Sequence, residues 1–258
     1  MNASLHPRGS PRLRRQAVTD TPRYATAPGH VRAVAFPHVL VLINYRTGSV
    51  QCLLPKSAAH WHEAARSGRL TAMPRLLAAH LLHIGALYPT PAPVPWAAPV
   101  SALAPAASWG SAEHPAGLAK ATGRFSTAAA TALVATSFIQ RAGPRARAMN
   151  RLVSALRTSA AFARRPASLA EAADAVLAIR RTAWHAPVRT ACLEESAAAA
   201  FLLATRRLSI VWCHGIAADP VRLHAWVQTV DGDTVAEPPS TLAYTPALTI
   251  GARHQHHP

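Results

Sequence analysis

The residues best suited to chemistry lie in the last third of the chain. Cys192 begins the run Cys-Leu-Glu-Glu-Ser-Ala-Ala-Ala-Ala-Phe-Leu-Leu-Ala-Thr-Arg-Arg, whose Ala and Leu content predicts a continuous helix to Arg207. The positive end of a helix dipole favours the thiolate form of a cysteine at the helix N-terminus. A thiolate there can attack a carbonyl carbon. Cys192 is therefore the candidate nucleophile.

A candidate base and a candidate acid follow Cys192. Residues 223–230 are rich in strand-forming side chains, and Asp231-Gly232 is a strong hairpin signal that leads into a short expected strand at 234–237. His224 lies on the first strand and Glu237 on the second, near the cross-strand position from which a carboxylate reaches the imidazole. A thiol peptidase or a transglutaminase needs this order of residues. The His accepts the thiol proton and the acid orients the ring.

Two other carboxylates lie close enough to replace Glu237. Asp231 and Asp233 flank the turn glycine, but we expect the turn itself to use them, so Glu237 ranks first. Trp226 shares a strand face with His224 because strand side chains alternate, and it either walls the site or only packs there.

The remaining residues of chemical type have simpler interpretations. Cys213 lies within an apolar run and is expected in the core, and His214 beside it is expected to point to solvent from the opposite face. Cys52 is expected to pack on an N-terminal strand. The pair Arg180-Arg181 is interpreted as a solvated helix end.

The charge does not indicate a nucleic-acid-binding protein. The formal net charge is +16, and nearly all of the positive charge is Arg, since Lys occurs only at Lys56 and Lys120. Abundant Arg and Ala together are typical of GC-rich codon usage. Neither a helix-turn-helix nor a zinc-finger pattern is present, nor a basic stripe interleaved with aromatics. We expect no nucleic-acid partner, and acidic peptides or proteins suit the surface better.

The cysteine and hydrophobic patterns indicate in which cellular compartment the chain is expected. The three cysteines form no CxxC pair and no even framework, which argues against a disulfide scaffold and a zinc site. The histidines at 254–257 lie in a tail without a second ligand set, so no metal is expected. The longest apolar stretch, residues 128–139, is too short to span a bilayer. We therefore expect a cytoplasmic chain with no membrane partner.

The chain is expected to have an α+β fold in two parts. Three β-rich runs, with a turn closed by Gly48, precede two helical segments, which indicates a small winged-helix-like N-terminal module. A Pro-rich stretch that starts at Tyr88 marks a linker. The expected N-terminal strands are residues 31–36, 39–44 and 49–54, and the helices are residues 57–66 and 74–86.

The C-terminal part is expected to pack a Cys-bearing helix on an antiparallel sheet. Ser168 and Glu171 form the sequence of a capping box at the start of its third helix. The expected helices are residues 127–140, 146–163 and 169–181, and an apolar strand is expected at 209–216. The expected division is a disordered basic arm at 1–28, the N-terminal module at 29–87, the linker at 88–118, the C-terminal domain at 119–250 and a flexible tail at 251–258.

Two short motifs carry a resemblance to a known family. Arg189-Thr-Ala-Cys-Leu-Glu-Glu-Ser196 and Leu223-His-Ala-Trp-Val-Gln228 closely resemble the B proteins of lasso peptide biosynthesis, which are transglutaminase-like leader peptidases. Residues 39–48 and the helix that contains Trp61 resemble the leader-recognition domain of the same pathways, which is similar to the small chaperone of pyrroloquinoline quinone assembly. The chain resembles the fused form, with both modules together.

The resemblance implies roles for the site residues. Cys192 would be the nucleophile and His224 the general base, in a domain with a papain/transglutaminase-like fold. Glu237 stands at about the place where the family usually carries Asp, which is a departure from the pattern. Gln228 stands where many relatives carry Glu.

The resemblance also implies two partners. The leader of a ribosomal precursor peptide would add as a strand along residues 49–54 and pack against the helix at 74–86. The expected leader-binding residues are Val50, Gln51, Cys52, Leu53, Leu76 and His80. An ATP-dependent, asparagine-synthetase-like lasso cyclase would then close the ring. The chain has no Gly-rich phosphate loop, so no cofactor is expected to bind here, and any ATP requirement is expected to reside in the cyclase.

Two alternatives stay open at this stage. The same Cys-His-acid set would serve a transglutaminase that passes the acyl group to an amine rather than to water. A chain whose triad had decayed would be a non-catalytic leader-binding adaptor. The presence of both Cys192 and His224 argues against this alternative.

Overall fold

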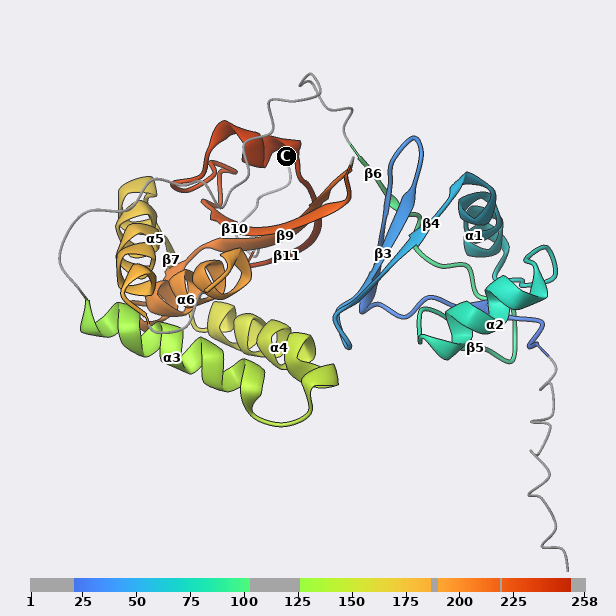
Figure 1. Cartoon of the computed structure of the whole chain (residues 1–258), viewed down its shortest axis with the longest axis horizontal. Helices are drawn as coiled ribbons and strands as arrows, with labels where there is room; N and C mark the ends of the chain where they lie inside the picture. Colours follow the sequence, from blue (N-terminus) through green and yellow to red (C-terminus); the bar gives the residue numbers. More distant parts are fainter. Residues whose placement is uncertain (1–20, 103–125, 187–189, 219, 252–258) are drawn as a thin grey trace, which may run out of the picture.

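The computed structural model describes residues 21–102, 126–186, 190–218 and 220–251 as two lobes (Figure 1). An N-terminal lobe holds a four-stranded sheet, a two-stranded pair and two helices, and a C-terminal lobe holds four longer helices beside a three-stranded sheet and a second two-stranded pair. The predicted α+β class is confirmed. None of the helices in these ranges is long and apolar enough to cross a membrane.

The N-terminal sheet is built from a hairpin, a tight turn and an edge strand. Strands β2 (Val31–Ala35), β3 (Leu40–Asn44) and β4 (Ser49–Leu53) pair antiparallel in sequence order. Gly48 has a φ of +81°, a left-handed conformation that glycine adopts without a steric penalty. Helices α1 (Pro55–Ser67) and α2 (Arg75–His83) follow, so the predicted order of three strands and two helices is confirmed.

Both ends of this lobe extend beyond the predicted limits. Strand β1 (Ala25–Thr26), expected in the disordered arm, pairs with β5 (Tyr88–Pro89), expected in the linker. Strand β6 (Val100–Ser101) adds a fourth strand, parallel to β2, in the order β4-β3-β2-β6. Edge pairings of two residues need few N–H donors, so a Pro-rich segment can supply them. The first part of the expected linker therefore belongs to the N-terminal lobe.

Helix α6 (Cys192–Thr205) is the central element of the C-terminal lobe. It packs against α3 (Thr127–Arg141), α4 (Ala148–Ala161) and α5 (Leu169–Trp184) and against the sheet. Its residues Ala197, Ala198 and Ala199 are fully buried. Small side chains let neighbouring elements approach this helix from several sides, which fixes the position of its first residue.

The second sheet has the strand order β10-β9-β11, all antiparallel. Strand β9 (Val211–Ala217) lies between β10 (Arg222–Gln228) and β11 (Thr245–Ile250). Strand β11, whose second residue is a proline, was not predicted. A two-residue pair, β7 (Arg165–Pro166) with β8 (Leu208–Ser209), joins the connection before α5 to the end of α6.

One predicted strand is absent and one predicted cap is present. Residues 234–237 make only a single bridge, Gln228 with Thr234, rather than a strand. Ala236 has a φ of +53°, which turns the chain away from the sheet, and two prolines follow it. At the start of α5, Ser168 Oγ accepts a hydrogen bond from the Glu171 N–H, and the Glu171 carboxylate accepts one from the Ser168 N–H. This capping box is confirmed.

The two lobes share one hydrophobic core. Val34, Val41 and Ile43 of the first sheet belong to the same buried cluster as Leu248 and Ile250 of β11. The opposite face of the first sheet packs on α1 and α2 through a second cluster that contains Leu40, Leu42, Leu53 and Trp61. The N-terminal sheet is thus covered on both faces.

A buried polar contact joins the lobes within this interface. Tyr45 Oη and His214 Nδ1 are hydrogen-bonded at 2.8 Å. The prediction that His214 points to solvent is wrong, because the N-terminal sheet covers that face of β9 and leaves 4% of His214 exposed. Burial, with a smaller contribution from the charge of His224, lowers the pKa of His214 to about 4, so its ring is neutral at neutral pH.

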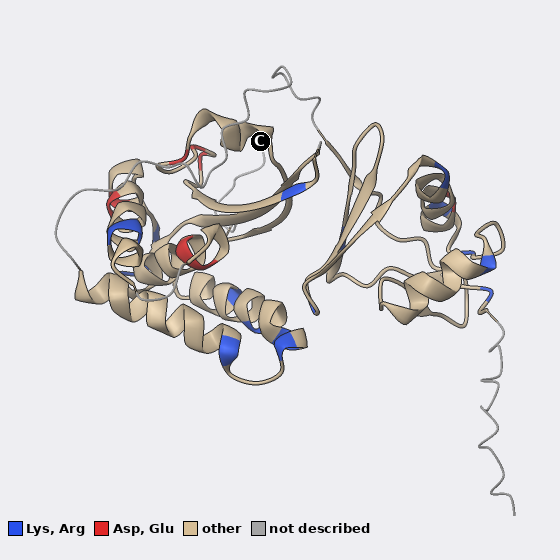
Figure 2. Cartoon of the chain, viewed as in Figure 1, with Lys and Arg blue, Asp and Glu red and all other residues tan. Residues whose placement is uncertain are grey.

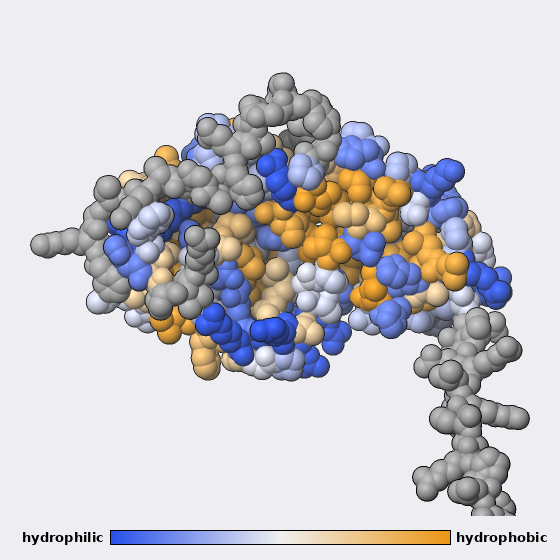
Figure 3. All heavy atoms as spheres, viewed as in Figure 1, coloured by the Kyte–Doolittle hydropathy of each residue, from blue (hydrophilic) through white to orange (hydrophobic). Residues whose placement is uncertain are grey.

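In this view the surface has scattered basic residues on both lobes (Figure 2) and a hydrophobic patch on the N-terminal lobe (Figure 3). Lys and Arg are spread over both lobes (Figure 2), rather than gathered along one face in this view. Hydrophobic residues gather around β3, β4 and α2 (Figure 3). Val50, Leu54 and Leu76 are among the exposed large hydrophobic residues there.

Tyr45→Phe tests the contact between the lobes. The substitution leaves a buried ring nitrogen of His214 without its partner, so we expect a loss of about 1–3 kcal/mol of unfolding free energy. Urea denaturation followed by tryptophan fluorescence measures it. Tyr88→Phe, at a residue that is 39% exposed, is the matched control and should change stability little. Equal midpoints for the two variants would show that the hydrogen bond does not stabilise the fold.

Candidate active site

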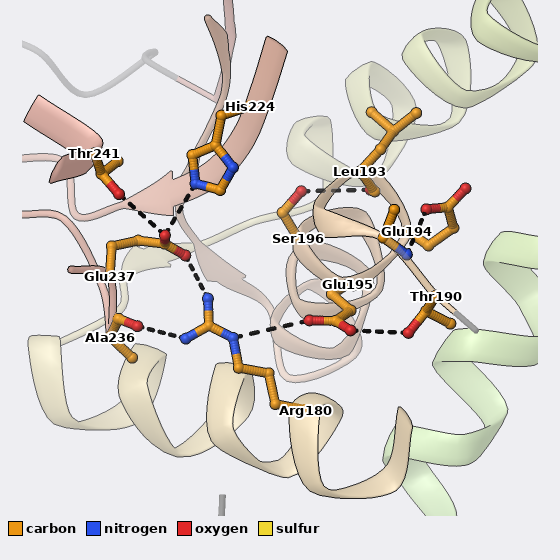
Figure 4. Close-up of polar contacts among 11 residues, drawn as sticks. Arg180, Thr190, Leu193, Glu194, Glu195, Ser196, His224, Ala236, Glu237 and Thr241 are labelled. Atoms are coloured by element: carbon orange, nitrogen blue, oxygen red, sulfur yellow. Dashed lines mark hydrogen bonds and ion pairs between the residues drawn. The ribbon is translucent and has the colours of Figure 1, made fainter. Parts of the chain in front are cut away.

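Cys192 is the first residue of α6 and is partly exposed. The residue before it, Ala191, is in extended conformation, and its N–H donates to the Glu194 carboxylate at 3.0 Å (Figure 4). Glu194 thus satisfies a backbone donor at the helix start while Cys192 stays accessible. Further along the helix, Ser196 Oγ accepts a 3.0 Å hydrogen bond from Trp212 Nε1, which ties α6 to β9.

His224 is brought to Cys192 by strand β10. It is opposite Gly215 of β9, and its side chain is 2% exposed. Burial lowers the pKa of His224, but hydrogen bonds and negative charge from Cys192 and Glu237 outweigh burial and raise the pKa to about 9. His224 is therefore positively charged at neutral pH. The structure thus brings together the Cys and the His that the sequence singled out.

Glu237 is the acid that contacts His224. Its Oε2 lies 2.9 Å from His224 Nε2 and accepts a 3.2 Å hydrogen bond from Thr241 Oγ1. Its Oε1 accepts a hydrogen bond from the Arg180 guanidinium (Figure 4). Asp231 and Asp233 are exposed, and no described contact joins either side chain to His224.

Aromatic rings enclose His224. Trp226 stacks on the imidazole with ring centroids 5.7 Å apart, and Tyr244 lies 5.1 Å from it. Gly215 makes room for this arrangement, because a Cβ there would lie 2.7 Å from the end of the Trp226 ring. Cys213, on the same strand, is fully buried, and burial raises the pKa of its thiol to about 12. This agrees with the predicted core position.

Three residues around the site were not anticipated. Thr241 and Tyr244 come from the 3-10 turn η3 (Pro239–Ala243) and its end, and no sequence pattern predicted this turn. Arg180 was interpreted as solvated, which is wrong, since its side chain is 15% exposed and ion-paired. A signal did exist, because Arg180 follows the buried residues Val176 and Ile179 at helical spacing on the inward face of α5.

The expected leader-binding residues lie along β4 and α2. Strand β4 is an edge strand of its sheet, with Val50 and Cys52 exposed. His80 Nε2 on α2 and Gln51 Oε1 on β4 are 3.1 Å apart, so the helix lies beside this edge. Leu76 is 87% exposed, whereas Leu53 is 3% exposed and packs in the core. Leu53 thus offers a ligand its backbone rather than its side chain.

Comparison with known proteins adds one finding. Residues 132–249 match the transglutaminase-like superfamily. This part of the chain is a transglutaminase-like domain. No curated protein and no solved structure matches the chain. The matched region includes Cys192, His224 and Glu237, and the match supports a fold of the cysteine-peptidase and acyltransferase type for this domain. The histidines at 254–257 lie outside the described residues.

The charge on His224 gives a pH prediction. Its pKa in the folded protein, about 9, exceeds the ordinary value of 6.5. Protonation of His224 therefore stabilises the fold fully below pH 6.5, and this contribution is lost as the pH rises through 9. NMR titration of ¹³C-labelled histidine should place the His224 midpoint well above 6.5, and Cys192→Ala should lower it. If the His224 midpoint is the same in Cys192→Ala as in the wild type, the Cys192–His224 pairing is contradicted.

Proposed function

We propose that this chain is a cysteine peptidase that removes the leader from the ribosomal precursor of a lasso peptide. The observation that carries the proposal is the pairing of Cys192 with His224, whose ring is hydrogen-bonded to Glu237, within a transglutaminase-like domain. The motifs around Cys192 and His224 supply the likeness to lasso B proteins, and the N-terminal lobe supplies a free strand edge.

The site's chemistry follows from its charge state. With His224 protonated beside Cys192, the thiolate attacks the carbonyl carbon at the leader–core junction and forms a tetrahedral intermediate. Backbone N–H groups at the start of α6 stabilise the oxyanion. His224 then gives its proton to the leaving amine, which frees the α-amine of the core. His224 next takes a proton from water, which attacks the acyl-enzyme and releases the leader as a carboxylic acid.

The N-terminal lobe would capture the leader by strand addition. An extended leader on the β4 edge gains main-chain hydrogen bonds, and its side chains meet Val50, Leu76 and His80. Because the two lobes share a core, a bound leader would stay attached to the same folded unit as Cys192, which would raise the effective concentration of the cleavage site.

The proposal includes a cytoplasmic location and a partner cyclase. The product amine must be joined to a side-chain carboxyl to form a macrolactam, which needs an activated acyl group and thus ATP. We assign that step to an asparagine-synthetase-like lasso cyclase, and any ATP requirement for cleavage belongs to the same partner.

Transglutaminase chemistry is the second candidate, because the matched superfamily includes acyltransferases as well as peptidases. Hydrolysis adds the mass of water across the cut bond, whereas transfer adds the acceptor amine to the acyl fragment. A leader-binding adaptor would do neither.

Cys192→Ala tests the nucleophile. We expect the purified wild-type chain to cut the precursor peptide encoded beside its gene once, and the variant to leave the precursor whole, because removal of the nucleophile abolishes acyl-enzyme formation. Mass spectrometry of the products, with and without cyclase and ATP, measures both. Ser154→Ala, at an exposed serine of α4, is the control and should keep the activity. A precursor that binds but stays whole under every condition would favour the adaptor.

Leu76→Asp tests the leader site. Leu76 is 87% exposed, so the fold does not depend on it, but a bound leader would cover it. Loss of one apolar contact and burial of a charge should weaken binding about tenfold or more. Fluorescence anisotropy of a labelled leader peptide measures the Kd. Phe138→Asp, at an apolar residue of α3 that is 71% exposed, should leave the Kd unchanged. Equal effects of both variants would place the leader elsewhere.

A further inference from the structure

Arg180 contacts the candidate active site, whereas an arginine at a solvated helix end would point into water. From α5 its guanidinium donates to the Glu237 carboxylate and to the Ala236 carbonyl oxygen. Its Nε also lies 3.9 Å from Glu195 Oε2, within ion-pair range. Figure 4 shows the guanidinium between the segment that carries Glu237 and the first turn of α6.

The contact with Glu237 fixes the orientation of the carboxylate. Oε1 is bound to Arg180 while Oε2 faces His224 and Thr241, so neither oxygen is free to rotate away from the imidazole. A planar guanidinium presents its N–H groups in a rigid fork, which suits a carboxylate and a neighbouring carbonyl held together. Ala236 needs such support, because its φ of +53° is unfavourable for a residue with a side chain.

The charge of Arg180 also meets a requirement of the reaction. Glu237 is 3% exposed, and a buried carboxylate needs a cation beside it. His224 supplies that cation only while it is protonated. When His224 gives its proton to the leaving amine, Arg180 is the cation still in contact with Glu237 among the described residues. Arg180 therefore keeps a positive charge beside the Glu237 carboxyl group before and after this proton transfer.

On the other side, Arg180 connects to the segment that carries the nucleophile. Glu195, three residues after Cys192, accepts a 2.8 Å hydrogen bond from Thr190 Oγ1, two residues before it. The ion pair of Arg180 with Glu195 therefore joins the turn around Cys192 to the acid behind His224.

We propose that Arg180 is a positioning residue that holds Glu237 against His224 and ties this acid–base pair to the helix start that bears Cys192. The inference rests on the proposed function, because it takes these three residues as the catalytic set.

Arg180→Gln tests the role without any peptide substrate. The rate of iodoacetamide alkylation of Cys192 at pH 7, read by peptide mass spectrometry, reports the fraction of thiolate paired with protonated His224. Exposed Cys52 in the same sample is the internal reference. If Glu237 leaves His224 in the variant, the pKa of His224 falls, and we expect alkylation of Cys192 to slow about tenfold. Glu237→Gln should have the same effect, and the double variant no more than either alone.

The direction of the His224 titration separates this role from others. Loss of a nearby positive charge alone would raise the pKa of His224, and a purely structural role would leave it unchanged. A raised or unchanged pKa of His224 in Arg180→Gln would overturn the proposal. Additive effects of Arg180→Gln and Glu237→Gln on the alkylation rate in the double variant would also overturn it. Arg157→Gln, at an exposed arginine of α4, is the matched control.

A second variant covers the case in which Arg180→Gln does not fold. Arg180→Lys keeps the charge but lacks the fork, so we expect alkylation between the wild-type and Glu237→Gln rates; a wild-type rate would contradict the need for the guanidinium. A separate outcome concerns the catalytic pair. If Cys192 is alkylated at the same rate as Cys52 in the wild type, and at the same rate in His224→Ala, then Cys192 and His224 are not a catalytic pair and Arg180 has no such pair to position.

Discussion

The buried carboxylate of Glu237 is the constraint on which the candidate active site depends. A charged group that is 3% exposed needs partners for both oxygens, and each partner comes from a different part of the chain: His224 from β10, Arg180 from α5 and Thr241 from η3. The path of the chain after β10 follows from this need. Residues 234–237 leave the sheet at Ala236 so that the acid approaches the imidazole from the side of α5.

Presentation of the nucleophile depends on packing as well as on polar contacts. Helix α6 is held by small buried side chains between three helices and a sheet, and Trp212 adds a hydrogen bond to Ser196. A helix so enclosed cannot shift along its axis without loss of core contacts. Its first residue is therefore held at a fixed distance from β10, which is what a thiol–imidazole pair requires.

Local sequence signals predicted most helices, the N-terminal hairpin and the pairing of Cys192 with His224. Helical period, a capping box and turn residues act over short distances, so they can be read from the sequence. The failures involved tertiary contacts. His214 was predicted exposed because the sheet that covers it is more than 150 residues away in sequence, opposite Tyr45. The pairing of β1 with β5, the strand β11 and the inward direction of Arg180 likewise depend on distant partners. The placement of the catalytic residues follows from the sequence, but their supporting contacts do not.

The hydrogen bond between Tyr45 and His214 has a consequence for how such proteins can be recombined. A binding lobe taken from another protein would have to present a hydroxyl at the same place, or it would leave a buried imidazole nitrogen without a partner. The apolar residues of both sheets also pack in one buried cluster, so the new lobe would have to be complementary in shape to the sheet of the C-terminal lobe. The N-terminal lobe therefore cannot be exchanged on its own: a chimaera needs both sides of the interface from one parent, or compensating changes on each.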